Sequence, residues 1–133
     1  MSNLDALVSL LRERIPGLLA VYLFGSGARG GLRADSDLDL AILLAQGLDL
    51  SSGQRLDLVA DLASLAGRTV DLSVLGKPGG TVLAKEAVTS GRRLWDDGTE
   101  AAAEFEMYAL SAYARLREDR APVEAAYSLS AHG

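Results

Sequence analysis

With 133 residues, the chain is long enough for one domain with its own hydrophobic core and too short for two. It contains no cysteine, which excludes disulfides, thiolate nucleophiles and cysteine zinc sites, and its formal net charge of -5 disfavours direct binding of long nucleic acids, whose partners normally carry a basic surface. No apolar run is long enough to cross a bilayer, and the first residues do not read as a signal peptide, so we expect a cytoplasmic protein with no membrane association.

Residues 4–24 predict an amphipathic helix followed by a buried strand. The helix places one apolar stripe at helical spacing, formed by Leu4, Leu7, Val8, Leu11 and Ile15. Ser2 or Asn3 is a suitable cap, and Pro16 stops the helix. The compact apolar run from Leu18 to Phe24 is typical of a buried strand, in which Tyr22 packs in or near the core.

A glycine-rich loop separates this strand from the next one. Residues 25–36 contain four glycines, together with Ser26 and Arg29. Backbone N–H groups beside Gly25 are free of Cβ crowding, so they and the Ser26 hydroxyl can approach phosphate oxygens closely. Such a loop taken alone is more often a flexible connection, and Arg29 could serve only to solubilise it.

Two further strands each carry acidic residues near their start. In the predicted strand Asp37–Leu44, Asp37 and Asp39 lie on one face because strand residues two apart point the same way. In the predicted strand Thr69–Leu75, Asp71 also lies opposite the apolar positions. Like charges so close repel one another unless a cation lies between them, and carboxylate oxygens on a strand suit Mg²⁺. If the two strands are neighbours, all three carboxylates can converge.

The remaining elements are mostly helical. A helix capped by Ser51 or Ser52 and ended by Gly67 is expected to pack through Leu56, Val59, Ala60 and Ala63. A short helix over residues 81–90 and a last short strand over residues 92–95, with Trp95 near the core, follow. A final helix of about residues 99–120 carries the stripe Phe105, Tyr108, Ala109, Ala112 and Leu116.

The order of these motifs resembles the polymerase-beta-like nucleotidyltransferase superfamily, and the short chain resembles its minimal nucleotidyltransferase (MNT) group. The shared pattern is Gly25-Ser26, ten residues, D-x-D at Asp37 and Asp39, and a third aspartate on the following strand. The A-R-G over residues 28–30 and the S-D-L-D-L-A-I-L over residues 36–43 also match, whereas Gly27 stands where members often carry a larger residue.

The resemblance implies an α/β (α+β) fold, with a mixed sheet of three to five strands covered by helices and an additional C-terminal helix. It implies one domain over residues 1–121 with its core at 18–96, and a flexible tail over 122–133. By the same resemblance, Asp37 and Asp39 bind two Mg²⁺ ions, and Asp71 is a metal ligand, a general base or both. Gly25, Ser26 and Arg29 then contact the phosphates of ATP.

Small members of the group are commonly antitoxins that transfer AMP from ATP to a tyrosine of a partner HEPN ribonuclease toxin, in a hetero-oligomer. The short, acidic chain favours such a protein acceptor over tRNA or DNA. Two alternatives remain: a nucleotidyltransferase for a small acceptor such as an aminoglycoside, and an antitoxin that acts only by occlusion. The three carboxylates on one face argue against pure occlusion, since nothing structural requires them.

Overall fold

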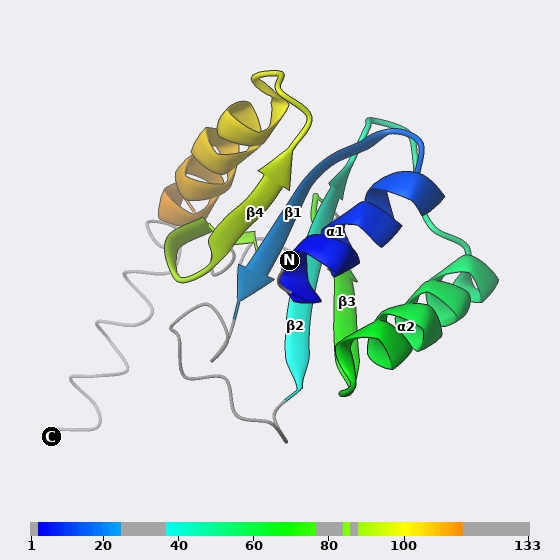
Figure 1. The fold of residues 1–133 in the computed structure, drawn as a ribbon. Coiled ribbons are helices and arrows are strands. Elements are labelled where there is room, and N and C mark those ends of the chain that lie inside the picture. The colour runs from blue at the N-terminus through cyan, green and yellow to red at the C-terminus, as the bar shows by residue number, and fades with distance from the viewer. Residues whose placement is uncertain (1–2, 25–36, 77–83, 86–87, 116–133) are drawn as a thin grey trace, which may run out of the picture.

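A four-stranded sheet forms the centre of the molecule (Figure 1). The structure is a computed structural model that describes residues 3–24, 37–76, 84–85 and 88–115. The elements in chain order are α1 (Asn3–Arg14), β1 (Leu18–Phe24), β2 (Leu38–Leu44), α2 (Ser52–Ala66), β3 (Val70–Val74) and β4 (Arg92–Asp96), followed by a helix over residues 101–115.

The sheet is mixed, as predicted, and its strand order is β3-β2-β1-β4. β1 pairs antiparallel with both β2 and β4, whereas β2 pairs parallel with β3. The parallel pair requires a crossover, which α2 supplies. As a result β2, which contains Asp39 and directly follows Asp37, lies in the interior of the sheet beside β3.

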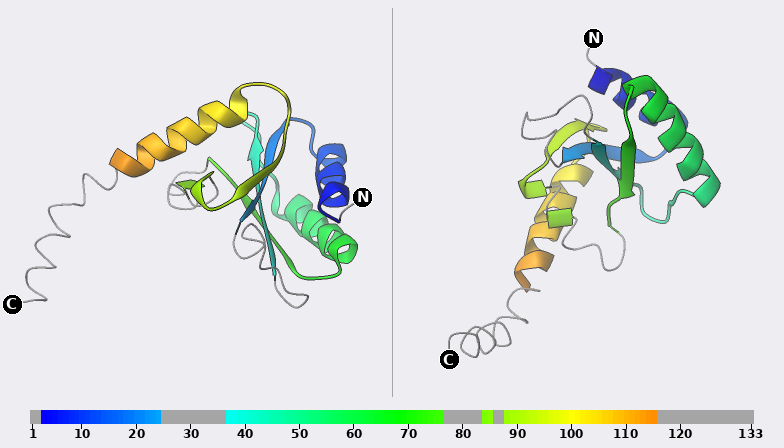
Figure 2. Two further views of the ribbon diagram at one scale, coloured as in Figure 1. Left: turned by 60° about the vertical axis from the view of Figure 1, so that its left-hand side comes forward. Right: turned by 90° about the horizontal axis from the view of Figure 1, so that it is seen from below.

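Helices lie on both faces of the sheet (Figure 2). α1 and α2 cover one face, where Arg14 of α1 forms an ion pair with Asp61 of α2, and the helix over residues 101–115 lies across the other. Each strand therefore needs apolar residues on both sides over much of its length, which explains why β1 and β2 are apolar almost throughout.

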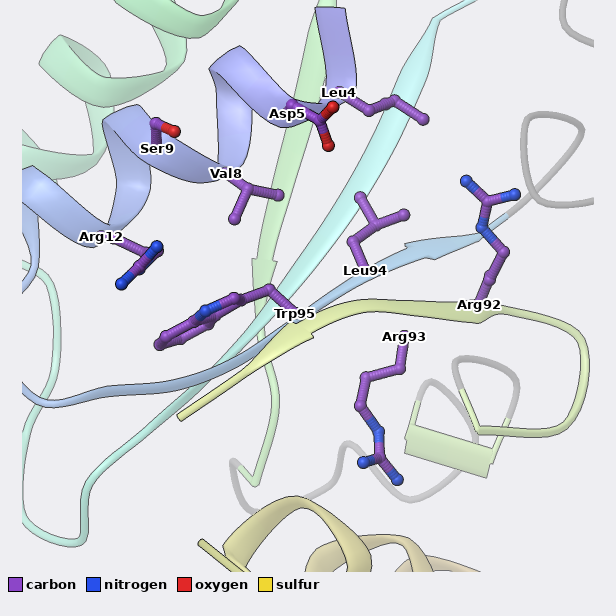
Figure 3. A pocket seen from close by; sticks show the side chains of 9 residues that line it. All are labelled: Leu4, Asp5, Val8, Ser9, Arg12, Arg92, Arg93, Leu94 and Trp95. Carbon is purple, nitrogen blue, oxygen red and sulfur yellow. The ribbon is translucent and has the colours of Figure 1, made fainter. Parts of the chain in front are cut away.

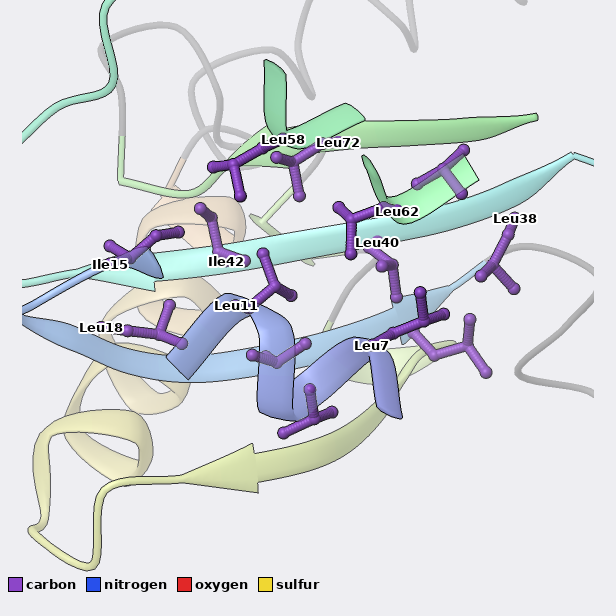
Figure 4. Close-up of a cluster of buried hydrophobic side chains, with 14 of the residues drawn as sticks. Leu7, Leu11, Ile15, Leu18, Leu38, Leu40, Ile42, Leu58, Leu62 and Leu72 are labelled. Atoms are coloured by element: carbon purple, nitrogen blue, oxygen red, sulfur yellow. The ribbon is translucent and has the colours of Figure 1, made fainter. Parts of the chain in front are cut away.

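The larger hydrophobic core lies between the sheet and the helices α1 and α2 (Figure 4). It contains the predicted stripe of α1, of which Leu7 and Leu11 are fully buried, and alternate residues of the strands. In β2 these are Leu38, Leu40, Ile42 and Leu44, as the alternation predicts. Ala41 and Leu43 point to the opposite face, into a smaller core with Ala20, Tyr22, Leu75 and Ala102.

α2 has the predicted caps but packs through only part of the predicted stripe. The Ser51 hydroxyl accepts a hydrogen bond from Gln54 N, while the Gln54 side chain accepts one from Ser51 N, and Gly67 closes the helix in the left-handed region at φ 72°. The predicted stripe is half right: Val59 and Ala63 pack against the larger core, but Leu56 is 70% exposed and Ala60 is exposed. The buried residues of the helix are Leu58 and Leu62. The predicted residues and the buried residues both have helical spacing in this leucine-rich segment. Only the way in which the helix lies on the sheet decides which of them are buried.

The last helix also departs in part from its predicted stripe. Ala109 is buried and Phe105 packs on the smaller core, as expected, but Tyr108 is 70% exposed. Leu116 and the predicted tail over residues 122–133 lie outside the described residues. Of the predicted short helix at residues 81–90, residues 84–85 and 88–89 are helical and most of the rest is not described. Within the described chain, no helix is long and apolar enough to cross a membrane.

Candidate active site

Two of the predicted acidic residues lie directly opposite each other on adjacent strands. Asp39 of β2 is in register with Asp71 of β3, and on its other side Asp39 is in register with Phe24, the last residue of β1. Asp37 immediately precedes β2. The predicted adjacency of the two acidic strands is therefore confirmed, and the carboxylates lie where β1 ends and β2 and β3 begin.

The three carboxylates differ in exposure. Asp37 and Asp71 are exposed, whereas Asp39, between two neighbouring strands, is half-buried. Burial of Asp39 raises the pKa of its carboxyl group above the ordinary value, and the negative charges of Asp71 and Asp37 raise it further. All three groups therefore share one electrostatic site, in which ionisation of Asp39 is less favourable than in water.

The sheet holds this site rigidly on one face. Asp39 points away from the large core, and the next two residues that point the same way along β2, Ala41 and Leu43, are buried in the smaller core. The strand carrying Asp39 is thus packed on both sides within a few residues of the carboxylate, so that its direction is set by side chains rather than by a loop.

The donor set fits a hard divalent cation. Within the described residues, no three His, Cys, Asp or Glu side chains are placed so that they could hold a metal ion by themselves. Mg²⁺ usually needs less from a protein: it binds one or two carboxylates and takes its other ligands from water and from substrate phosphates. The opposed pair Asp39 and Asp71, with Asp37 beside it, meets that requirement. The pKa of Asp39 is raised first by burial and then by the charges of Asp71 and Asp37, and a bound cation would offset both effects.

The residues predicted to contact phosphates, Gly25, Ser26 and Arg29, lie outside the described residues, as does Gly27. They are connected directly to the site by sequence, since the segment that contains them joins the end of β1 to Asp37. Their roles stay predictions.

The sequence does not single out Glu106, which connects three elements on the same face of the sheet. The Tyr22 hydroxyl donates a hydrogen bond of 2.9 Å to Glu106 Oε1, and the Arg93 guanidinium donates two, of 3.0 Å from Nε and 2.5 Å from an Nη. Burial raises the pKa of the Tyr22 phenol, and the hydrogen bond to Glu106 raises it further. Because a buried tyrosine needs a partner for its hydroxyl, sequence could predict that one exists but not which residue it is.

Comparison with known proteins identifies the family. The family described as "Polymerase beta, Nucleotidyltransferase" matches residues 6–100, which include β1, β2, β3, β4 and all three acidic residues. The chain belongs to this family. The sheet, its mixed topology and the helices on both faces are those of the polymerase-beta-like nucleotidyltransferase fold.

Relatives of this nucleotidyltransferase include proteins of known activity and structure. Protein adenylyltransferase MntA from Shewanella oneidensis is 39% identical over 119 residues, which span 89% of this chain and 82% of the relative. A crystal structure of a toxin-antitoxin with AMP-PNP matches with a TM-score of 0.82 and 31% identity. The match covers 96% of this chain and 99% of the chain in that structure. A structure of tri-AMPylated Shewanella oneidensis HEPN toxin in complex with MNT antitoxin matches with a TM-score of 0.74 and 33% identity. The match covers 95% of this chain and 96% of the chain in that structure.

Proposed function

We propose that this nucleotidyltransferase is a Mg²⁺-dependent protein adenylyltransferase and an antitoxin, which transfers AMP from ATP to a tyrosine of a partner HEPN ribonuclease toxin. The observation that carries the proposal is the opposition of Asp39 and Asp71 across the parallel strands β2 and β3, with Asp37 beside them. The 39% identity to an adenylyltransferase that acts on protein, over 89% of this chain, supports a protein acceptor.

The carboxylates have separable roles in the proposed reaction. Asp37 and Asp39 would hold two Mg²⁺ ions, and Asp71, in register with Asp39, would face the attacking hydroxyl. Bound Mg²⁺ would lower the pKa of that hydroxyl and neutralise charge on the triphosphate. Asp71 acts there as a ligand, as the base that takes the phenolic proton, or as both. The tyrosine oxygen forms the new bond to the α-phosphorus, and the bond to the bridging oxygen breaks, so that pyrophosphate leaves.

The glycine-rich segment joins two of the elements that carry the acidic site. It joins the end of β1 to Asp37 in the sequence, and Phe24, the last residue of β1, is in register with Asp39. In the proposed mechanism its backbone N–H groups at Gly25 and the Ser26 hydroxyl bind the β and γ phosphates, and Arg29 offsets negative charge that develops on the departing pyrophosphate.

The proposal is tested by mixing the purified chain with its HEPN toxin partner, ATP and Mg²⁺, and measuring intact masses. We expect the toxin to gain mass in AMP-sized steps, and no gain when EDTA replaces Mg²⁺. The double variant Asp37→Asn with Asp39→Asn should lose transfer because the metal ligands are lost. Asp57→Asn is a matched control, since it removes one exposed carboxylate of α2, away from the acidic strand ends.

Two other results would contradict the proposal. An unmodified toxin that is nevertheless inhibited, equally by the natural chain and by the double variant, would show an antitoxin that acts by occlusion. Consumption of ATP with an aminoglycoside in the absence of the toxin would show a small-molecule nucleotidyltransferase.

A further inference from the structure

A pocket lies on the face of the sheet opposite the acidic residues, between α1 and β4 (Figure 3). Its volume is about 330 Å³. Leu4, Val8 and Arg12 of α1 line one side, and Arg92, Leu94 and Trp95 of β4 line the other. None of these residues has a role in the proposed transfer reaction.

An irregularity in β4 creates the apolar floor of this pocket. The register between β1 and β4 shifts, so that Val21 pairs with Trp95 and Tyr22 pairs with Arg93, leaving Leu94 as an extra residue. As a result Leu94 and Trp95, although adjacent, both pack against the core under α1. Arg93 points the other way, toward Glu106, whereas Arg92 remains on the pocket side (Figure 3).

The pocket has two exposed guanidinium groups with unused donors. Arg12 lies over the Trp95 ring, 4.9 Å from its centroid. This stacking occupies the flat face of the guanidinium and leaves its in-plane N–H groups available. The guanidinium group of Arg92 forms no hydrogen bond or ion pair with any described residue. Asp5 adds one negative charge to the lining, so the pocket carries a net positive charge on a chain whose overall charge is -5.

We propose that this pocket, which we call the α1–β4 pocket, is a docking site for an acidic, extended segment of the protein acceptor. The two ends of the pocket would each bind one carboxylate, at Arg92 and at the Arg12 guanidinium stacked on Trp95. The apolar floor formed by Leu94 and Val8 would contact the intervening side chains. This inference rests on the proposed function, because it assumes that the acceptor is a protein.

Two observations favour an extended polypeptide over a free phosphate group. First, Arg92 and Trp95 are three residues apart on β4, which corresponds to about 10 Å along a strand, a spacing that suits two side chains of one extended segment. Second, β4 is an edge strand, and no described strand pairs with its outer side. Its backbone groups can therefore hydrogen-bond an added extended segment, whose alternate side chains would then reach the arginines.

A docking site on this face would separate recognition from chemistry. Asp39 and Asp71 point to the opposite face of the sheet from the α1–β4 pocket, although Arg92 lies near the same end of the sheet because Leu23 is in register with both Arg92 and Leu40. Contacts in the α1–β4 pocket should therefore change the affinity for the acceptor and leave the rate of transfer from the bound complex unchanged.

The test compares binding and transfer in the double variant Arg12→Gln with Arg92→Gln, using the purified HEPN toxin as the probe. Charge-assisted hydrogen bonds are the strong ones, so we expect the toxin to bind at least about tenfold more weakly, with KM raised and kcat unchanged. The affinity of the natural chain should also fall with salt more steeply than that of the variant. Arg115→Gln is the control for each of the single variants Arg12→Gln and Arg92→Gln, because it likewise removes one positive charge, from the helix on the opposite face.

Equal affinity of the natural chain and the double variant would overturn the proposal, as would a loss in Arg115→Gln equal to that in each single variant, which would indicate a nonspecific charge effect. Retained toxin affinity in the double variant, combined with loss of ATP or AMP binding outside the active site, would show a nucleotide site instead. If the natural chain binds the toxin without modifying it, the proposed function fails, while the docking site is still judged by the change in toxin affinity alone.

Discussion

The hydrogen bonds of Glu106 provide a quantitative test of how the last helix is fixed to the sheet. In the variant Glu106→Ala, the Tyr22 hydroxyl, on a side chain only 1% exposed, loses its acceptor. A buried hydroxyl left without a partner costs about 1–3 kcal/mol. The ion pair between Arg93 and Glu106, whose side chains are 35% and 22% exposed, adds about 0.2–1 kcal/mol, and Arg93 keeps its second partner, Asp96.

The expected loss in the free energy of unfolding is therefore about 2 kcal/mol. It can be measured by urea titration, followed by the fluorescence of Trp95, the single tryptophan of the chain. Glu104→Ala is the control, because this glutamate is exposed on the same helix and the substitution is identical. Tyr22→Phe should cost less than Glu106→Ala, since it removes the buried donor together with the bond. A loss for Glu106→Ala equal to that for Glu104→Ala would refute the reasoning.

Three further predictions concern pH, metal and capping. The pKa of Tyr22 is raised in the folded chain, whereas a tyrosine in the unfolded chain ionises near about pH 10. The stability that this difference contributes is present below about pH 10 and is lost as the pH rises further. Tyr22→Phe should therefore flatten the fall in the free energy of unfolding between about pH 10 and 12, measured by urea titration. The pKa of Asp39 is also raised in the folded chain, so its ionised form lowers stability at neutral pH. Asp39→Asn should therefore raise the free energy of unfolding in EDTA at pH 7 but not at pH 3. A free energy of unfolding at pH 7 below that of the natural chain would contradict this. Ser51→Ala removes the cap of α2 and should lower the free energy of unfolding by about 1 kcal/mol, whereas a thermal or urea midpoint unchanged from the natural chain would contradict the capping role.

The sequence predicted individual strands well because their signals are local. β1 coincides with the predicted strand, and β2, β3 and β4 differ from prediction by one residue at some ends. The caps of α2 were likewise predicted, since Ser51 and Gly67 act through their own backbone and near neighbours. The packing face of α2 was predicted only at Val59 and Ala63. Leu56 and Leu58 are chemically equivalent, and which of them is buried depends on the way the helix lies across the sheet.

The acidic site shows the same division. Alternation along a strand is enough to predict that Asp39 points away from the core that contains Leu40, and the structure confirms it. The contribution of Asp71 depended on whether its strand lies beside β2, which no local pattern determines. The parallel ladder decides this by placing Asp71 directly opposite Asp39.

By itself, the sequence determined which residues can do chemistry and which segments carry them, because residue type and alternation are properties of a short stretch of chain. Only the tertiary structure decided which strands are neighbours, that Glu106 accepts the hydrogen bond of Tyr22 across 84 positions of sequence, and that Leu94 and Trp95 turn to the same side to form the floor of a pocket with α1. These features arise from sheet order, register and helix docking. Each of them is fixed by contacts between segments that are distant in the chain.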